Sequence, residues 1–347
     1  MDIKKFFDNL WKTESTDWTY LHLPPSQTPE NLPEEIIEPN VHYVEITLKS
    51  LRIDSVREGL KRFYGVVHSF ISVPHLGGKN LDFYVVTAPN QLRDMDPSNA
   101  DKIISVNIPL LGQVPYRGVG IKFELGLFSV KSSDLTESLV NLFSDMSAVA
   151  GVSFASAALP YAQFLNKGID FLTGNSNDTN LEIGLSTTMK EMKTGYYVVM
   201  QASKDQVHVK DLFIDKDDYK LVNKNLEAYK LFPYMVFEVK ASNVRRDWFQ
   251  IPELSAAYQV LKQQLRSMRF DDAKKSLDAL EVLLLNSDDL LFDDAEKIYR
   301  RIYDECDKIL NRKSSRQEMS ERQLSYGGKP DYYPDDQLPD LEQLNVS

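Results

Sequence analysis

The strongest constraint on the fold is an alternation of apolar and polar residues with a period of two. It is clearest over residues 121–127 (IKFELGL), where Lys122 and Glu124 separate isoleucine, phenylalanine and leucine. Successive side chains of a β-strand point to opposite faces of the sheet, so this segment places its apolar residues on one face. The pattern predicts a strand with one face in the core and the other in water, as is typical of antiparallel sheets.

Nine segments have strand patterns rich in β-branched and aromatic residues, five before residue 134 and four after residue 174. They cover residues 41–53, 62–73, 81–87, 103–108, 119–130, 181–187, 195–203, 206–214 and 234–242. We expect an α+β chain whose main unit, residues 41–250, is a mostly antiparallel β-sandwich with a helical insertion at about 134–174. Two smaller packed β units are the alternative arrangement.

The expected insertion begins with a capping-box pattern, Asp134 followed three residues later by Glu137. Residues 146–166 then contain no charged residue, and at this length a membrane span has to be considered. Gly151 and Pro160 would interrupt a helix there. A buried helical hairpin packed against the sheet is therefore the expectation, and a membrane-active segment is the alternative.

The two ends of the chain differ from the middle. Residues 2–12 have the spacing of a short amphipathic helix, which either docks on its own domain or anchors at a membrane interface. A proline-rich linker extends from there to residue 40. Residues 251–311 have helical periodicity and predict a helical hairpin or three-helix region, and residues 312–347 have the composition of a disordered acidic tail.

The tetrapeptide FDDA occurs twice in the helical region, at residues 270–273 and 292–295. Each copy stands near the start of an apolar-periodic run. Aspartate in a first turn is favoured by the helix dipole, so both copies predict helix starts. Two copies are too few to define a repeat array.

Charge and cysteine content limit the classes of function. The formal net charge of −11 argues against a duplex-DNA binder held by phosphate neutralisation. The single cysteine, Cys306, excludes an intramolecular disulfide and is typical of a reducing cytoplasm. The first residues carry charges within their apolar run and lack a signal-peptide cleavage site. These features predict a cytoplasmic protein.

Motifs that identify an enzyme are absent from the sequence. It contains no phosphate-binding loop, dinucleotide fingerprint, H-E-x-x-H zinc motif or nucleophile elbow. A large, well-patterned scaffold without a catalytic motif favours a non-enzymatic binding or adaptor component that acts with other proteins of the same system. No cofactor is expected. A bound calcium ion is the alternative.

Asp94, Asp96 and Asp101 fall on a turn between two expected strands, and Asp54 falls on an earlier loop. Calcium is bound by several carboxylate oxygens that converge from loops, so these four residues are candidate calcium ligands. The alternative is a surface turn that is rich in aspartate because aspartate suits turns.

The segment QLRDMDPSNADKIISVNIPL, together with the strand order over residues 41–131, resembles the lipid-binding β-sandwich domain typified by protein kinase C. This resemblance implies a sandwich fold, loop-bound calcium and contact with lipid. Where that family needs further carboxylates, however, this chain has Lys61 and Arg62, which would repel a cation. With Arg57 they form a basic cluster, which predicts peripheral binding to an anionic membrane surface.

A second resemblance concerns Glu238 and Lys240 in the segment YMVFEVKAS. This spacing is similar to the Glu-x-Lys half-motif of the restriction-endonuclease-like nucleases, in which the glutamate holds magnesium and the lysine polarises the attacking water. Asp218 could supply the required upstream acid. A magnesium-dependent nuclease is therefore the alternative to the adaptor function. Glu238 and Lys240 can also be interpreted without catalysis, as an exposed pair on an amphipathic strand.

The stretch from Val114 to Val140 and the helical region behind it resemble uncharacterised β-sandwich proteins of bacterial defence loci. The resemblance implies an adaptor role in antiphage defence. Within the stretch, Pro115 and Gly118 are residues that a tight turn before a strand requires, so we interpret PYRG as a corner of the scaffold.

Overall fold

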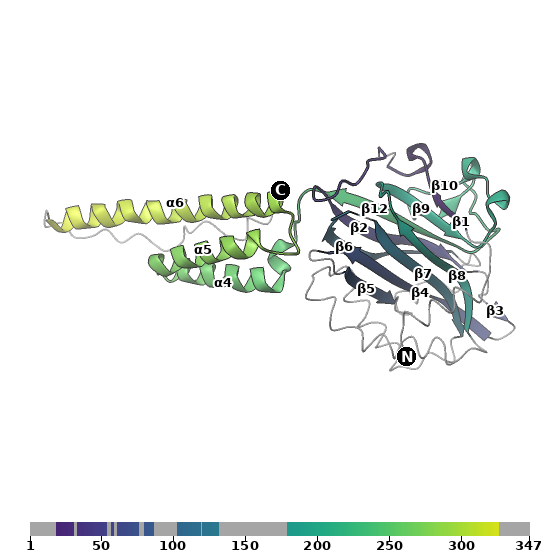
Figure 1. Ribbon diagram of the computed structural model, residues 1–347, viewed down its shortest axis with the longest axis horizontal. Coiled ribbons are helices and arrows are strands. Elements are labelled where there is room, and N and C mark those ends of the chain that lie inside the picture. Colours follow the sequence, from purple (N-terminus) through teal and green to yellow (C-terminus); the bar gives the residue numbers. More distant parts are fainter. Residues whose placement is uncertain are drawn as a thin grey trace. The chain divides into compact units, whose positions relative to one another are not determined.

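A computed structural model describes residues 19–30, 33–53, 57–58, 61–75, 80–86, 103–118, 120–131 and 179–325. The chain divides into two compact units, Met1–Ser242 and Asn243–Ser347. Every described strand belongs to unit 1 and every described α-helix to unit 2 (Figure 1). The chain is α+β and mostly β, as the sequence predicted.

Unit 1 contains a five-stranded antiparallel sheet with the order β1–β9–β12–β2–β6, which we call sheet 1. Its strands are β1 (Thr19–His22), β2 (Tyr43–Arg52), β6 (Ile103–Pro115), β9 (Gly195–Met200) and β12 (Tyr234–Ser242). The sequence analysis missed β1, which is too short to show a period. The predicted strand at 103–108 ends before a proline, whereas β6 continues through it to Pro115. Because β6 lies at the edge of the described sheet, proline is tolerated there.

Sheet 2 of unit 1 is also antiparallel and has the order β3–β4–β7–β8, with β5 paired to β4. Its strands are β3 (Arg57–Glu58), β4 (Lys61–Pro74), β5 (Asn80–Val86), β7 (Ile121–Lys131) and β8 (Thr179–Met189). The turn from β6 into β7 contains Gly118 and Gly120, whose φ angles of 90° and 88° are accessible to glycine. A Cβ atom at Gly120 would lie 2.7 Å from the carbonyl oxygen of Met189, so this corner requires glycine.

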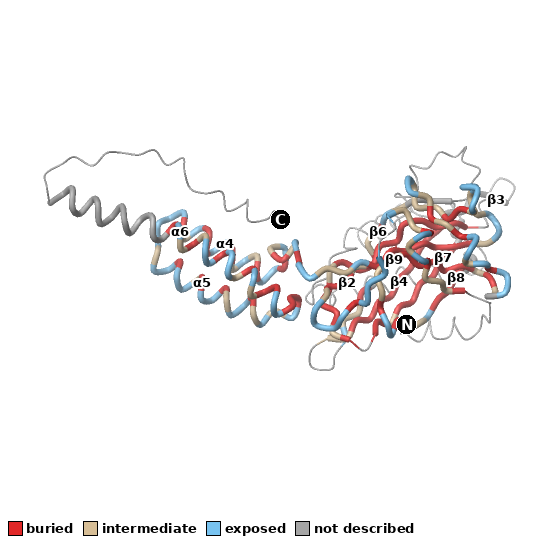
Figure 2. The backbone as a smooth tube through the Cα atoms, turned by 90° about the horizontal axis from the view of Figure 1, so that it is seen from above, coloured by how far each residue is buried: buried red, intermediate tan, exposed pale blue. Residues whose placement is uncertain are grey.

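The two sheets enclose one apolar core, to which inward-facing residues of both contribute (Figure 2). In β7 the four predicted inward residues are fully buried in this core, namely Ile121, Phe123, Leu125 and Leu127. This arrangement is a β-sandwich, in which each strand presents alternate residues to the opposite sheet.

The prediction that the other face of β7 is solvated is wrong at Glu124. This residue is only 2% exposed, and its neighbours on the same face are buried too, His68 at 0% and Phe70 at 6%. The Glu124 carboxylate lies 2.5 Å from Lys122 Nζ, and burial of a charge is tolerated when it is paired. The helical insertion expected at 134–174 lies outside the described residues.

Residues 201–233 cover the outward face of sheet 1. They form two 3-10 helices, η5 (Lys204–Gln206) and η6 (Val209–Asp211), and a small hairpin of β10 (Phe213–Ile214) and β11 (Leu221–Val222). Their apolar side chains form a second cluster with the outward residues of β9 and β12. The strand predicted at 206–214 is mostly wrong, because the capping box of Ser203 and Gln206 starts a helical turn there.

Unit 2 consists of η7 (Trp248–Gln250), α4 (Pro252–Arg266), α5 (Phe270–Leu285) and α6 (Phe292–Ser325), and α5 packs against both other α-helices. Both FDDA copies begin a helix, as predicted. Their alanines, Ala273 and Ala295, are 1% exposed and give neighbouring helices room to approach.

The predicted start of disorder at residue 312 is wrong as far as Ser325, because α6 continues to that residue. Its last turns are rich in lysine, arginine, glutamate and glutamine, which have high helix propensity and favour continuation of the helix. Among the described residues, no helix combines the length and the apolar character that crossing a membrane requires.

Candidate functional site

Charged and aromatic side chains gather on the outward side of sheet 1, where β2, β9 and β12 meet the covering segment. We call this group the Glu238 cluster; its members are Glu30, Lys49, Asn107, Tyr196, Tyr219, Glu238 and Lys240. It includes two of the three residues of the predicted nuclease motif.

Two local irregularities of the sheet place Lys49 in the cluster. The β2–β12 register shifts between Val236 and Phe237, which leaves Lys49 as the extra residue of a bulge. On the facing strand β6, Asn107 adopts a positive φ of 49° and its Oδ1 accepts a hydrogen bond from Lys49 Nζ at 2.9 Å. Bulges re-aim side chains and are frequent beside functional sites.

Glu238 is the centre of the cluster and is 2% exposed. Its Oε2 lies 3.1 Å from Lys49 Nζ and 3.1 Å from Lys240 Nζ. Lys49 is buried, whereas the Lys240 side chain is 52% exposed. The structure therefore brings Glu238 and Lys240 together on one face, as their spacing predicted, but both lysines are engaged with the same carboxylate oxygen.

The tyrosines connect this ion pair to the N-terminal segment. Tyr196 lies directly opposite Glu238 in the sheet and donates a hydrogen bond to Glu30 Oε2 at 2.6 Å. Tyr219 donates to the other oxygen of Glu30 at 3.5 Å, and Lys49 Nζ lies 4.3 Å from the centre of the Tyr219 ring. Burial and the bond to Glu30 raise the pKa of Tyr196 far above its ordinary value, so its hydroxyl remains a donor.

The charges of the cluster determine what it can do chemically. Two lysines face two glutamates, which leaves the group neutral overall. Desolvation lowers the pKa of Lys240, but the nearby carboxylates, of which Glu238 contributes most, together outweigh this effect and the net shift is upward. A lysine held protonated against a buried carboxylate does not provide a base or an open metal ligand. The arrangement is suited to holding β2, β9, β12 and the N-terminal segment together.

Asp218, the third member of the predicted motif, is engaged elsewhere. Its Oδ2 lies 2.5 Å from Lys220 Nζ, and its Oδ1 accepts a hydrogen bond from the Lys220 backbone at 3.1 Å. Within the described ranges, no three acidic, histidine or cysteine side chains are arranged to hold a metal ion. The described residues thus place Glu238 with Lys240 but give Asp218 a turn-stabilising role.

The basic cluster falls on the β3–β4 hairpin. Its register places Arg57 opposite Arg62 and Glu58 opposite Lys61. The hairpin therefore brings the three predicted lipid-binding residues together in the chain, although their side chains lie outside the description. The four candidate calcium ligands, Asp54, Asp94, Asp96 and Asp101, lie outside the described residues.

A feature that the sequence analysis did not identify is the docking of the proline-rich segment. Residues 33–40, which we call the strap, run beside the β8–β9 turn. Thr194 N–H donates to the Glu35 carbonyl at 2.9 Å, and Ile37 N–H donates to the Met192 carbonyl at 2.9 Å. Ile37 is 2% exposed and belongs to the main core. The strap is extended, as predicted for a linker, but it is part of the sandwich.

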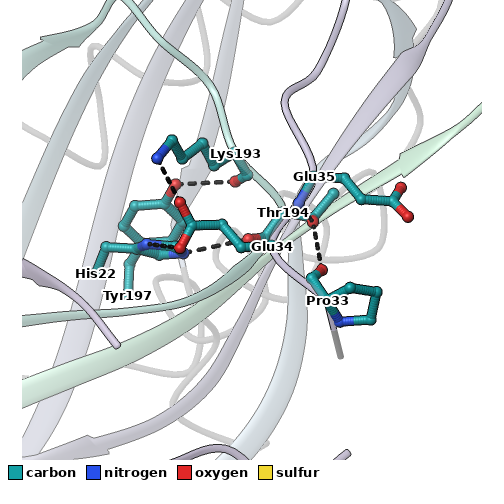
Figure 3. Close-up of polar contacts among 7 residues, drawn as sticks. All are labelled: His22, Pro33, Glu34, Glu35, Lys193, Thr194 and Tyr197. Atoms are coloured by element: carbon teal, nitrogen blue, oxygen red, sulfur yellow. Dashed lines mark hydrogen bonds and ion pairs between the residues drawn. The ribbon is translucent and has the colours of Figure 1, made fainter. Parts of the chain in front are cut away.

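Polar side chains fix the beginning of the strap (Figure 3). Glu34 pairs with Lys193, and its Oε2 lies 3.7 Å from His22 Nδ1. His22 Nε2 lies 3.1 Å from the Thr194 carbonyl, and because a carbonyl only accepts, Nε2 carries the hydrogen in this contact. The hydrogen bond from Lys193 holds the pKa of Glu34 below its ordinary range. The adjoining hollow of about 10 Å³ is too small for a ligand, so this contact is structural.

The sequence contained little signal for either arrangement. The bulge that positions Lys49 leaves no mark in a period-two pattern, and Glu30 and Glu34 stand in a segment with linker composition. Comparisons with protein-family models, curated proteins and solved structures found no match for this chain.

Proposed function

We propose that this protein is a non-enzymatic binding or adaptor component of a multiprotein assembly. The observation that supports this proposal most is that Glu238 is buried and contacted by two lysines. A magnesium-dependent nuclease needs an accessible carboxylate and a lysine that faces the attacking water. Here the carboxylate is 2% exposed and both nearby lysines contact it.

A second observation that supports the adaptor role comes from unit 2. Several apolar side chains of unit 2 are more than a third exposed, namely Val260, Met268, Val282, Leu283, Phe292 and Tyr303. Exposed apolar side chains of this kind can supply contact area to a partner protein. The defence setting implied by the sequence resemblance remains part of the proposal.

Co-purification of the full chain from its source cells, followed by quantitative mass spectrometry, tests the adaptor role. We expect a stoichiometric partner that is lost with Val282→Asp. The matched control is Leu231→Asp, which changes an equally apolar side chain that is 74% exposed in unit 1. Retention of the same proteins by both variants, or the absence of any stoichiometric partner, would contradict the proposal.

Peripheral membrane association is a second candidate function, and the β3–β4 register favours it. The register places Arg57 opposite Arg62 and Lys61 opposite Glu58, so the hairpin backbone gathers three basic residues and one acidic residue. A local excess of positive charge of this kind attracts anionic lipid headgroups.

Co-sedimentation with phosphatidylserine-containing vesicles tests this second candidate. We expect binding that weakens as salt is raised and that is lost when Arg57, Lys61 and Arg62 are all changed to glutamine. Neutral phosphatidylcholine vesicles are the control. If the wild type remains in the supernatant at low salt, with and without calcium, the candidate is excluded.

A further inference from the structure

A hollow of about 530 Å³ opens on the covering segment of sheet 1. It is lined by Val207, His208, Val209, Lys210, Asp211 and Lys224. This volume falls within the range of about 300–1,000 Å³ that is typical of small-molecule sites. None of these residues belongs to the Glu238 cluster or to the basic hairpin.

The walls of the hollow are held in place on both sides. Gln27 Nε2 donates hydrogen bonds to the carbonyls of Val209 and Leu212, each at 2.7 Å. Val207 and Leu212 anchor the same turn in the apolar cluster beneath it. Opposite them, the Asn223 side chain accepts hydrogen bonds from the backbone of Asn225 and Glu227, which fixes the turn that carries Lys224. A preformed backbone wall reduces the ordering cost of binding a ligand.

The charge of the lining is unusual for this chain. Three cationic or protonatable groups, His208, Lys210 and Lys224, surround one carboxylate, Asp211. Lys224 Nζ lies 2.7 Å from Asp211 Oδ1 and is neutralised by it. The pKa of Asp211 is lowered first by its hydrogen bond and charge interaction with Lys224, and then by the nearby charges of His208 and Lys210. Lys210 therefore provides one surplus positive charge, in a chain whose net charge is −11.

We propose that this hollow binds the phosphate group of a small anionic ligand. Lys210 and Lys224 would donate charge-assisted hydrogen bonds to phosphate oxygens, and His208 would add a third donor when protonated. Asp211 orients Lys224 but competes with the incoming anion. The phosphate could come from a free phosphorylated metabolite or from a lipid headgroup, and the chemistry of the contact is the same for both.

Isothermal titration of the full chain with inorganic phosphate and with pyrophosphate at low salt tests the site. Lys210→Gln is expected to weaken binding about tenfold, because it removes one charge-assisted bond. Asp211→Asn is expected to strengthen binding severalfold, because it removes the competing carboxylate. A role of Asp211 in folding alone would not produce that gain. Lys216→Gln, at an exposed lysine outside the lining, is the charge-matched control and should leave the affinity unchanged.

Vesicles distinguish the two sources of phosphate. If vesicles that contain phosphatidic acid compete with pyrophosphate for the wild type, and Lys210→Gln abolishes this competition, a lipid headgroup reaches the site. If pyrophosphate binds and the vesicles do not compete with it, the ligand is a soluble phosphorylated molecule. Absence of binding by the wild type, or equal losses for Lys210→Gln and Lys216→Gln, overturns the proposal.

Discussion

At the residue scale, the burial of Glu238 beside Lys49 makes a direct energetic prediction. Removing one partner of a buried ion pair leaves the other charge without compensation, which typically costs about 3–5 kcal/mol. We expect Glu238→Ala to lower the free energy of unfolding in urea by an amount in that range. Lys240 is half exposed, so Lys240→Ala is expected to cost less than about 1 kcal/mol. Equal losses in the two variants would contradict a buried pair centred on Lys49.

His68 predicts a pH dependence of stability. It is fully buried in β4, and this desolvation lowers its pKa from 6.5 to about 3. As pH falls below 6.5, the unfolded chain therefore takes up a proton that the folded chain does not. This histidine should make the folded state less stable by up to about 1.4 kcal/mol per pH unit between 6.5 and 3.

Urea unfolding at pH 7.5, 6 and 5 measures this effect. A plot of the free energy of unfolding against pH should have a shallower slope for His68→Leu than for the wild type. His208→Gln, which replaces an exposed histidine, is the control substitution. An unchanged slope in His68→Leu would show that other groups cause the dependence.

At the element scale, one buried arginine holds the start of unit 2. Arg245 is 0% exposed; its backbone N–H donates to Asp294 Oδ2 at 2.8 Å, and its guanidinium donates to the Asp289 carbonyl at 2.9 Å. These bonds fix the turn before α6 and the first turn of that helix. The network explains why the second FDDA copy has a buried aspartate, which is 2% exposed.

We expect Arg245→Ala to destabilise unit 2 by about 1–3 kcal/mol, because the buried Asp289 carbonyl loses its guanidinium donor. The backbone bond from residue 245 to Asp294 is retained in this variant. Helix content measured by far-ultraviolet circular dichroism during thermal unfolding reports this loss. The neighbouring Arg246 is exposed, so Arg246→Ala is the matched control and should behave as the wild type. Equal effects of the two changes would contradict the anchoring role of Arg245.

The strap offers a second test at this scale. Gly195 has a φ of 126°, and a Cβ atom there would lie 2.8 Å from His22 Nε2. Gly195→Ala should therefore displace His22 and loosen the strap, at a cost of about 1–3 kcal/mol. Faster hydrogen exchange at the Ile37 amide, with no change at amides of β7, is the expected readout. Unchanged protection of Ile37 would show that the strap does not depend on this contact.

The elements also show what sequence patterns can and cannot predict. Strands such as β7 were predictable because their core-facing residues are apolar at every second position, which gives the period of two. The same pattern gave a wrong strand prediction at residues 206–214. Val207 and Leu212 are buried there at the ends of the 3-10 helices η5 and η6. The pairing of Glu238 with Lys240 followed from their spacing within one strand. The approach of Lys49, by contrast, depends on a bulge that only the tertiary pairing of β2 reveals.

At the scale of the whole molecule, each unit has its own apolar core. The sandwich core draws on both sheets, and the buried residues of unit 2 recur along α4, α5 and α6. We therefore expect residues 1–242 and 243–347 to fold when expressed separately. Overlay of their amide NMR spectra on that of the full chain provides the measurement. Collapse of dispersion in either fragment would show that its fold depends on the rest of the chain.

The central claim is that Glu238 and Lys240 stabilise the sandwich and do not catalyse a reaction. Incubation of the wild type and Glu238→Gln with plasmid and single-stranded DNA in the presence of magnesium, paired with thermal unfolding of both proteins, tests it most directly. We predict no cleavage by either protein and a clear loss of thermal stability in the variant. Cleavage by the wild type that Glu238→Gln abolishes without changing the unfolding temperature would contradict the claim.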